Sequence, residues 1–213
     1  MTLRHALIAC ALLAALGWWY SGHSPRRANA PTGVATASGC PLPPGVGTDQ
    51  APLQTDVPDA MPAFDLQAAT LQPLAGFSVD ARVLSREDYS LGREADLSPT
   101  DLALGWQRMR EDGVLSQLQI SQSSRWYSYR WQDPPPLPPQ EIARSSANMH
   151  MIPATDDVAA ALARVRKGDR VRIDGWLVEA RASDGWRWRS STTRDDSGGG
   201  ACEVVYVCAI TRL

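Results

Sequence analysis

Alternation of hydrophobic and polar residues predicts two β-rich regions in this chain. Residues 77–83 place phenylalanine and aliphatic side chains at every second position, with polar or charged residues between them. This two-residue period is typical of a strand with one buried face. Residues 168–213 read as three or so strands separated by polar turns, and they form the clearest pattern in the sequence. We therefore expect the chain to close on a meandering β-sheet.

Helix-start signals follow the first predicted strand. Ser98 can cap a helix, Pro99 suits its first position, and Asp101 completes a spacing like that of a capping box. We expect this helix to end near Glu111, and a second short helix to follow over residues 114–120.

The middle of the chain predicts a strand, a loop and a helix. Residues 124–131 are rich in aromatic side chains and arginine, which favours a strand. The prolines of residues 134–139 predict an exposed, polyproline-like loop. Residues 142–152 predict a strand or turn, which leads into a helix over residues 158–165 that Thr155 can cap.

This order of elements predicts an α+β fold. We expect one small domain over residues 63–213, with two to three short helices on a strongly bent, mainly antiparallel sheet. The phrase Gly-Asp-x-Val-x-Ile-x-Gly-x-Leu-Val at residues 168–178 resembles strands of small OB-like and SH3-like barrels. In such barrels a glycine lets the strand coil sharply.

Residues 1–22 predict a signal anchor, a transmembrane segment in the inner membrane. A short basic start precedes an uncharged, mainly apolar run of about 17 residues, which is the short end of what spans a bilayer. Aromatic residues 18–20 end the run as interfacial residues do. Cleavage is the alternative, but the one suitable site, which ends at Ala30, is followed by Pro31, and proline there blocks signal peptidase.

Residues 23–62 are rich in proline, glycine and alanine and have no hydrophobic period. This composition predicts a disordered tether, with a few residues near 52–54 docking on the domain. Arg26 and Arg27 outnumber Arg4, which argues against export under the positive-inside rule. The early position of the segment and the lack of a later span argue for export. We expect a single-pass protein with its body in the periplasm; secretion to the periplasm after signal cleavage is the alternative.

The predicted domain carries a net negative charge. The 213 residues hold 21 basic and 23 acidic side chains, and three of the arginines lie in residues 1–30, which hold no acid. Residues 31–213 therefore carry a net charge of −5. Nucleic acids are bound largely by neutralising their phosphates, so this charge argues against nucleic acid as the partner. A local basic patch stays open as an alternative.

One histidine of the predicted domain is the candidate for catalysis. His150 lies near Ser145 and Ser146 in the sequence, but no Gly-x-Ser-x-Gly motif surrounds a serine. A structural role for His150 is the simpler interpretation. The histidine and cysteine spacing matches no zinc site, and residues 195–197 are more simply a solvated loop than a calcium site. We expect no metal and no cofactor.

Three cysteines outside the predicted anchor allow limited pairing. Cys202 and Cys208 flank one predicted strand, so they would lie about 20 Å apart. A disulfide needs Cα atoms within about 7 Å, so these two should not bond to each other. In an exported protein Cys40 could pair with either of them and fasten the tether to the sheet. Buried thiols are the default, and the choice stays open.

Arginine and aromatic residues interleave in two places, and this is the most suggestive feature of the sequence. On adjacent strands, an arginine face could bind an anionic polymer or a carboxylate, and exposed aromatic rings could stack on bases or sugars. The alternative is that the tryptophans belong to the core and the arginines to the solvated face of an antiparallel sheet. The candidate binding residues are Arg125, Arg130, Trp131, Trp186, Arg187, Trp188 and Arg189.

Four phrases resemble a family of uncharacterised proteobacterial proteins that have a single N-terminal hydrophobic segment. These phrases are residues 81–85, 97–106, 146–154 and 184–191. The resemblance spans residues 42–208 and implies one domain behind an N-terminal hydrophobic segment. It implies no activity, cofactor or catalytic residue.

These observations predict a non-enzymatic, membrane-tethered domain of the cell envelope. We expect it to bind an envelope protein or a glycan through its arginine- and tryptophan-bearing sheet. Two alternatives stay open. One is an envelope hydrolase that uses His150 with Ser145 or Ser146. The other is an OB-like protein that binds single-stranded nucleic acid.

Overall fold

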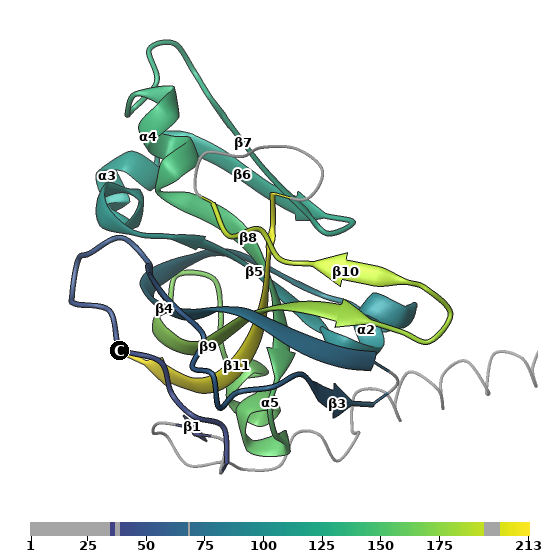
Figure 1. The fold of residues 1–213 in the computed structure, drawn as a ribbon. Helices are drawn as coiled ribbons and strands as arrows, with labels where there is room; N and C mark the ends of the chain where they lie inside the picture. The colour runs from purple at the N-terminus through teal and green to yellow at the C-terminus, as the bar shows by residue number, and fades with distance from the viewer. Residues whose placement is uncertain (1–34, 37–38, 68, 194–200) are drawn as a thin grey trace, which may run out of the picture.

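The computed structural model describes residues 35–36, 39–67, 69–193 and 201–213. Over these residues the chain has an α+β fold with a large, strongly curved, mixed sheet and few helices (Figure 1). The predicted anchor, residues 1–22, lies outside the described residues. Within the described part of the chain, no helix is long and apolar enough to cross a membrane.

The elements are short except for three long strands. The helices are α2 (Arg93–Leu97), α3 (Asp112–Leu115), α4 (Pro139–Arg144), α5 (Asp156–Leu162) and the 3-10 helix η2 (Gln107–Arg110). The strands are β1 (Ala35–Thr36), β2 (Leu53–Thr55), β3 (Phe64–Leu66), β4 (Ala69–Asp88), β5 (Thr100–Gly105), β6 (Leu118–Ser123), β7 (Trp126–Trp131), β8 (Ser146–Pro153), β9 (Arg170–Arg181), β10 (Arg187–Arg189) and β11 (Glu203–Arg212).

Five of the strands close into a ring. Strand β4 pairs with β5, β5 with β8, β8 with β11, β11 with β9, and β9 again with β4. Within this ring β8 and β11 run parallel, and the other four pairings are antiparallel. Four short strands extend this sheet: β1 pairs with β11, β2 and β3 pair with β4, and β10 pairs with β9. Strands β6 and β7 form a separate hairpin. The described sheet is therefore a small barrel with additions.

The interior of the ring is apolar and receives every second side chain of its strands. On β4 these are the hydrophobic residues of 77–83, which confirms the predicted strand there. Helix α5 packs Val158 and Leu162 against the same core. As predicted, the Thr155 side chain caps this helix, accepting a hydrogen bond from the Val158 amide at 3.3 Å.

The predicted helix over residues 98–111 is wrong. Residues 100–105 form strand β5, and Ser98 follows the end of α2 instead of starting a helix. Leu102 and Leu104 are fully buried in the ring, so pairing with β4 and β8 outweighs the local capping signals. The second predicted helix, over residues 114–120, is also largely wrong, because α3 ends at Leu115 and β6 begins at Leu118.

The remaining local predictions fare better. Strand β7 confirms the predicted strand at residues 124–131, and β9, β10 and β11 confirm the closing sheet. The proline-rich stretch is only partly an exposed loop. Leu137 is buried in it, and Pro139 begins helix α4.

The second half of the predicted tether is packed on the sheet, so the expected disorder is wrong there. The Trp176 ring N–H donates to the Pro41 carbonyl at 2.8 Å, and the Val46 amide donates to the Ser78 hydroxyl at 2.8 Å. Strand β2 pairs with β4, which confirms the predicted docking near residues 52–54. These hydrogen bonds satisfy main-chain groups that a free tether would leave to water.

A disulfide joins the start of this segment to the last strand. Cys40 bonds to Cys208, with their Cα atoms 5.6 Å apart and a sequence separation of 168. This settles which cysteine pairs with Cys40, and it corrects the default of a buried thiol at Cys208. Cys202 and Cys208 are not bonded to each other, as the length of the strand between them predicts.

Removing the disulfide should destabilise the fold. We expect Cys208→Ser to lower the free energy of unfolding by about 2–4 kcal/mol, because the bond restricts a long loop of the unfolded chain. Urea denaturation with and without reductant measures this. The difference between oxidised and reduced protein should vanish in Cys208→Ser and persist in the control Cys202→Ser. A difference that persists in Cys208→Ser would contradict the pairing.

Candidate functional site

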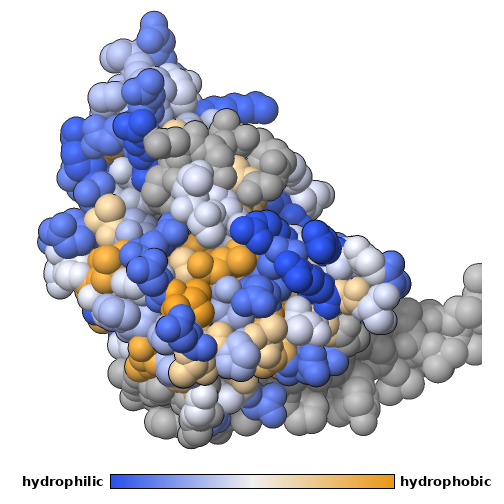
Figure 2. All heavy atoms as spheres, viewed as in Figure 1, coloured by the Kyte–Doolittle hydropathy of each residue, from blue (hydrophilic) through white to orange (hydrophobic). Residues whose placement is uncertain are grey.

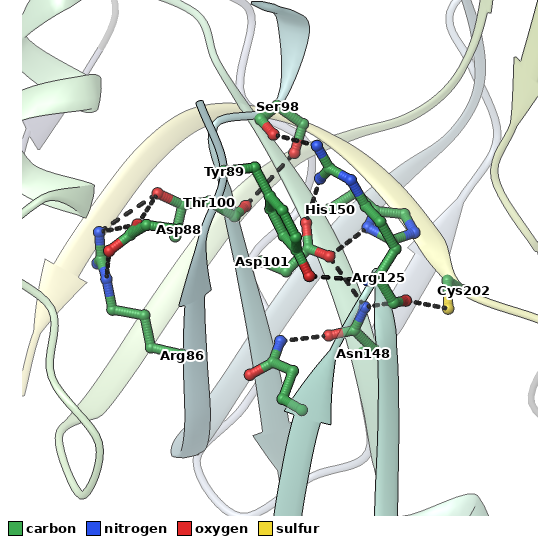
Figure 3. A network of polar contacts seen from close by, with 11 residues as sticks. Arg86, Asp88, Tyr89, Ser98, Thr100, Asp101, Arg125, Asn148, His150 and Cys202 are labelled. Carbon is green, nitrogen blue, oxygen red and sulfur yellow. Dashed lines mark hydrogen bonds and ion pairs between the residues drawn. The ribbon is translucent and has the colours of Figure 1, made fainter. Parts of the chain in front are cut away.

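The outer face of β5 and β8 carries a buried polar network (Figure 3). Asp101 and His150 lie directly opposite each other across the two strands. Asn148 lies two residues before His150 on β8 and therefore on the same face of the sheet. All three are less than 5% exposed. Because the neighbouring leucine and methionine side chains point into the ring, this alternation turns the polar ones outward.

Asp101 is the centre of the network. Its Oδ1 accepts a hydrogen bond from Arg125 Nη1 at 2.7 Å, and its Oδ2 lies 2.9 Å from His150 Nδ1. Asn148 Nδ2 donates to the same Oδ2 at 3.3 Å. A buried carboxylate is costly unless it is paired and hydrogen-bonded, and these three neighbours meet that requirement.

Arg125 comes from the turn of the β6–β7 hairpin. Ser124 and Arg125 both have positive φ angles, 49° and 68°, at the two-residue turn between these strands. Such angles suit tight hairpins but cost energy in residues other than glycine. The Arg125 guanidinium offsets this cost, because it also donates to the Ser98 carbonyl at 3.0 Å and lies 4.0 Å from the Tyr89 ring centroid.

Trp188 of β10 covers the network from outside. Its ring centroid lies 4.8 Å from that of His150, and the Arg125 guanidinium lies 5.3 Å from the Trp188 ring. The His150 imidazole therefore lies between the Asp101 carboxylate and the Trp188 ring. The arrangement fixes the hairpin and β10 onto the barrel, and it leaves His150 only 4% exposed.

The candidate serines are not brought to His150. Ser146 lies four residues before it on β8, a separation of about 13 Å along an extended strand. The Ser146 hydroxyl donates to the Ile142 carbonyl at 2.7 Å, and the Ser145 hydroxyl donates to Gln107 Oε1 at 3.4 Å. Neither hydroxyl has the contact with His150 that general-base activation requires.

The candidate arginines and tryptophans fall into two groups. Strands β7 and β10 belong to different sheets, so the expected adjacent strands do not form. On β10 and the turn before it, Trp186 and Trp188 pack partly against the core, while Arg187 and Arg189 are exposed. Figure 2 shows strongly hydrophilic residues over the β10 side of this face. Arg125 joins the β10 group, whereas Arg130 and Trp131 lie at the other end of β7.

The exposed arginines of β10 face a buried acid on β9. Glu179 Oε1 accepts from Arg181 Nε at 2.7 Å, and its Oε2 accepts from Arg189 Nη1 at 2.6 Å. Arg187 Nε lies 3.8 Å from the same carboxylate. The hydrogen bond from Arg181, followed by that from Arg189, lowers the pKa of Glu179 to about 2. The positive charge of these arginines is therefore partly balanced by the carboxylate of Glu179 in the same sheet.

A groove opens beside the network, between β7 and β8. It has a volume of about 160 Å³ and carries three aromatic rings of the hairpin together with the polar side chains of β8 and α4. Sequence reasoning missed it, because its walls come from segments far apart in the chain. The alternation of rings along β7 was the available signal. The rings of the hairpin are those of Trp126, Tyr127 and Tyr129, and the groove is also lined by Trp106, Arg144, Ser146, Asn148, Cys202 and Glu203.

In the described part of the chain, no three histidine, cysteine or acidic side chains are grouped so that they could hold a metal ion. Residues 195–197, considered above for calcium, lie outside the described residues.

Asp101→Asn should destabilise the protein strongly. Its fully buried carboxylate pairs with the partly buried guanidinium of Arg125, so neutralising it leaves that charge without an anionic partner, and we expect a loss of about 3 kcal/mol. Chemical denaturation measures the loss. The matched control is Asp184→Asn, which breaks an exposed ion pair with Arg93 and should change stability little. Equal losses in the two variants would contradict the proposed role of Asp101.

Glu179 should make stability depend on acidity. Its folded-state pKa is depressed from 4.5 to about 2, so the carboxylate stabilises the fold above about pH 4.5. This contribution is lost as the pH falls toward about 2. Glu179→Gln should therefore flatten the pH dependence of unfolding over this window, as denaturation at several pH values measures. A pH dependence that is unchanged in Glu179→Gln would contradict the assignment.

Comparison with known proteins adds no relative. No protein-family model, curated protein or solved structure matches this chain.

Proposed function

We propose that this protein is a non-enzymatic, membrane-tethered domain of the cell envelope that binds a glycan. The observation that carries the proposal is the aromatic groove between β7 and β8, on the outside of the closed ring. Aromatic rings offer flat apolar faces on which sugar rings or bases stack. The exposed side chain of Arg144 stands beside them and can orient hydroxyl groups.

We infer that the ring is an OB-like barrel. It has five strands, and counted along the chain its second and third are β5 and β8. OB folds bind oligonucleotides and oligosaccharides on the face of these two strands and the loops beside it. The groove and the Asp101 network both lie on that face. The position of the groove therefore supports a ligand-binding role.

Size and charge favour a glycan over nucleic acid. Pockets that enclose a whole small molecule measure roughly 300–1,000 Å³. The groove holds about 160 Å³, which suits one ring of a longer chain. It is lined by one arginine, Arg144, and residues 31–213 carry a net charge of −5. Binding to nucleic acid would require basic side chains that neutralise several phosphates, so a glycan, which carries less charge, fits this groove better.

The disulfide supports export of the body. Disulfides persist in oxidising compartments such as the periplasm and are rare in the cytosol. Cys40 and Cys208 are joined, and the sequence of residues 1–22 predicts the membrane anchor.

The surroundings of His150 support a non-enzymatic role. It is enclosed by Asp101 and Trp188, about 13 Å along β8 from Ser146.

A glycan array tests the proposal, with the full chain in detergent and a single-stranded oligonucleotide as the comparison probe. We expect saturable glycan binding that changes little with salt. Trp126→Ala should weaken it about tenfold or more, because a stacking ring is lost. The matched control is Trp131→Ala, which removes another exposed tryptophan of the same strand that does not line the groove.

Three outcomes would contradict the proposal. One is salt-sensitive binding to the oligonucleotide without glycan binding, which would favour a nucleic-acid role. Another is equal weakening by the two tryptophan variants, which would move the site away from the groove. The third concerns the compartment: an alkaline phosphatase fused after Leu213 should be active in cells, and an inactive fusion would place the body in the cytoplasm.

A further inference from the structure

A second concave site lies where the start of β9 meets β4 and η2. This arginine cleft has a volume of about 550 Å³, and its charged lining residues are Arg82, Arg108, Arg110, Arg170, Asp49 and Glu111. Four arginines face two acids across it, so its lining is net positive although the predicted domain is negative. The arginines come from three segments of the chain, and the fold brings them together.

A buried carboxylate holds two of these guanidinium groups side by side. Asp80 of β4 has a side chain that is only 2% exposed. Arg170 binds it with two hydrogen bonds of 3.0 Å, from Nε and Nη2, and Arg110 Nη1 donates to it at 3.1 Å. Two such bonds fix the plane and direction of the Arg170 group. Asp80 thus lies buried behind the lining of the arginine cleft and holds two of its guanidinium groups in place.

The two guanidinium groups repel each other in this arrangement. Burial lowers the pKa of Arg110 below its ordinary value, and the positive charge of Arg170 lowers it further. Asp80 supplies one negative charge for these two guanidinium groups. A second anion above the pair would relieve the repulsion.

The chain supplies that second anion from a loop. The Asp49 carboxylate contacts Arg110 Nη2 and lies 3.7 Å from Arg170 Nη2. Its side chain is 64% exposed, and its φ angle is positive, at 61°. An exposed ion pair contributes little stability, so this contact is easily exchanged for one with a ligand.

The other two arginines extend the cleft beyond Asp49. Arg82 binds Asp112, and Arg108 lies 3.5 Å from Glu141. Asp112 is 88% exposed and Arg108 is 54% exposed, so both contacts are solvated. A ligand with more than one acidic group could therefore reach a second guanidinium after taking the place of Asp49.

We propose that the arginine cleft binds a small polycarboxylate, with the Asp49 side chain occupying the position of one ligand carboxylate. The two planar guanidinium groups can donate hydrogen bonds to a planar carboxylate, and the loop group that they contact, Asp49, is itself a carboxylate. The site is independent of the groove between β7 and β8. It makes Asp49 an internal competitor whose removal frees the binding position.

Calorimetric titration of the full chain in detergent with citrate at low salt tests this proposal. Asp49→Asn should bind citrate about tenfold more tightly than the wild type, because the competing carboxylate is gone. The matched control is Asp59→Asn, which makes the same charge change at another exposed residue of the N-terminal segment and should leave citrate affinity unchanged. Circular dichroism checks that both variants are folded.

A second pair of variants tests the contact with ligand. Arg108→Gln should weaken citrate binding several-fold, and Arg130→Gln, which removes an exposed arginine outside the cleft, should not. The proposal is overturned if Asp49→Asn shows no saturable binding at about 10 mM citrate, or if Asp59→Asn raises affinity equally. Inorganic phosphate binding as tightly as citrate would overturn the carboxylate assignment. Trp126→Ala should leave citrate binding intact, which separates this test from that of the groove.

Discussion

The pairing of β11 with two neighbours is the constraint on which the rest of the structure depends. Strand β11 runs parallel to β8 and antiparallel to β9, and these two pairings close the curved sheet into a ring. The close approach has a local requirement: a Cβ at Gly175 of β9 would clash with the Tyr206 carbonyl of β11. The same strand carries Cys208, which fastens Cys40 and the segment after it. Ring closure thus decides both the core and the placing of the N-terminal segment.

Once the ring is closed, its outside offers two different chemical environments. Over β5 and β8, a hairpin and β10 cover a carboxylate that accepts a hydrogen bond from a guanidinium and lies 2.9 Å from an imidazole nitrogen (Figure 3). Beside them the rings of β7 line an aromatic groove. Near the start of β9, the buried carboxylate of Asp80 holds the guanidinium groups of Arg110 and Arg170, and the Arg170 side chain is 41% exposed. The first network fixes structure, whereas the groove and the cleft retain accessible binding groups.

Burial separates the structural polar groups from those suited to binding. Asp101 and His150 are nearly inaccessible, so their contacts serve the packing of the hairpin and of β10. Trp126 is 52% exposed and Asp49 is 64% exposed, so each can exchange solvent or a weak contact for a ligand. A sugar chain and a small anion would therefore use different parts of one rigid barrel. The two proposals can fail separately because they share no residue.

The sequence by itself determined what depends on neighbouring residues. The alternation at 77–83, the Thr155 cap, the closing strands and the exclusion of a Cys202–Cys208 bond follow from local geometry, and the structure bears them out. Tertiary structure alone decided that residues 100–105 form a strand, because pairing with β4 and β8 outweighs the local helix signals at Ser98 and Pro99. It also decided the Cys40–Cys208 bond, the groove and the arginine cleft. Their parts are distant in the chain, and only ring closure brings them together.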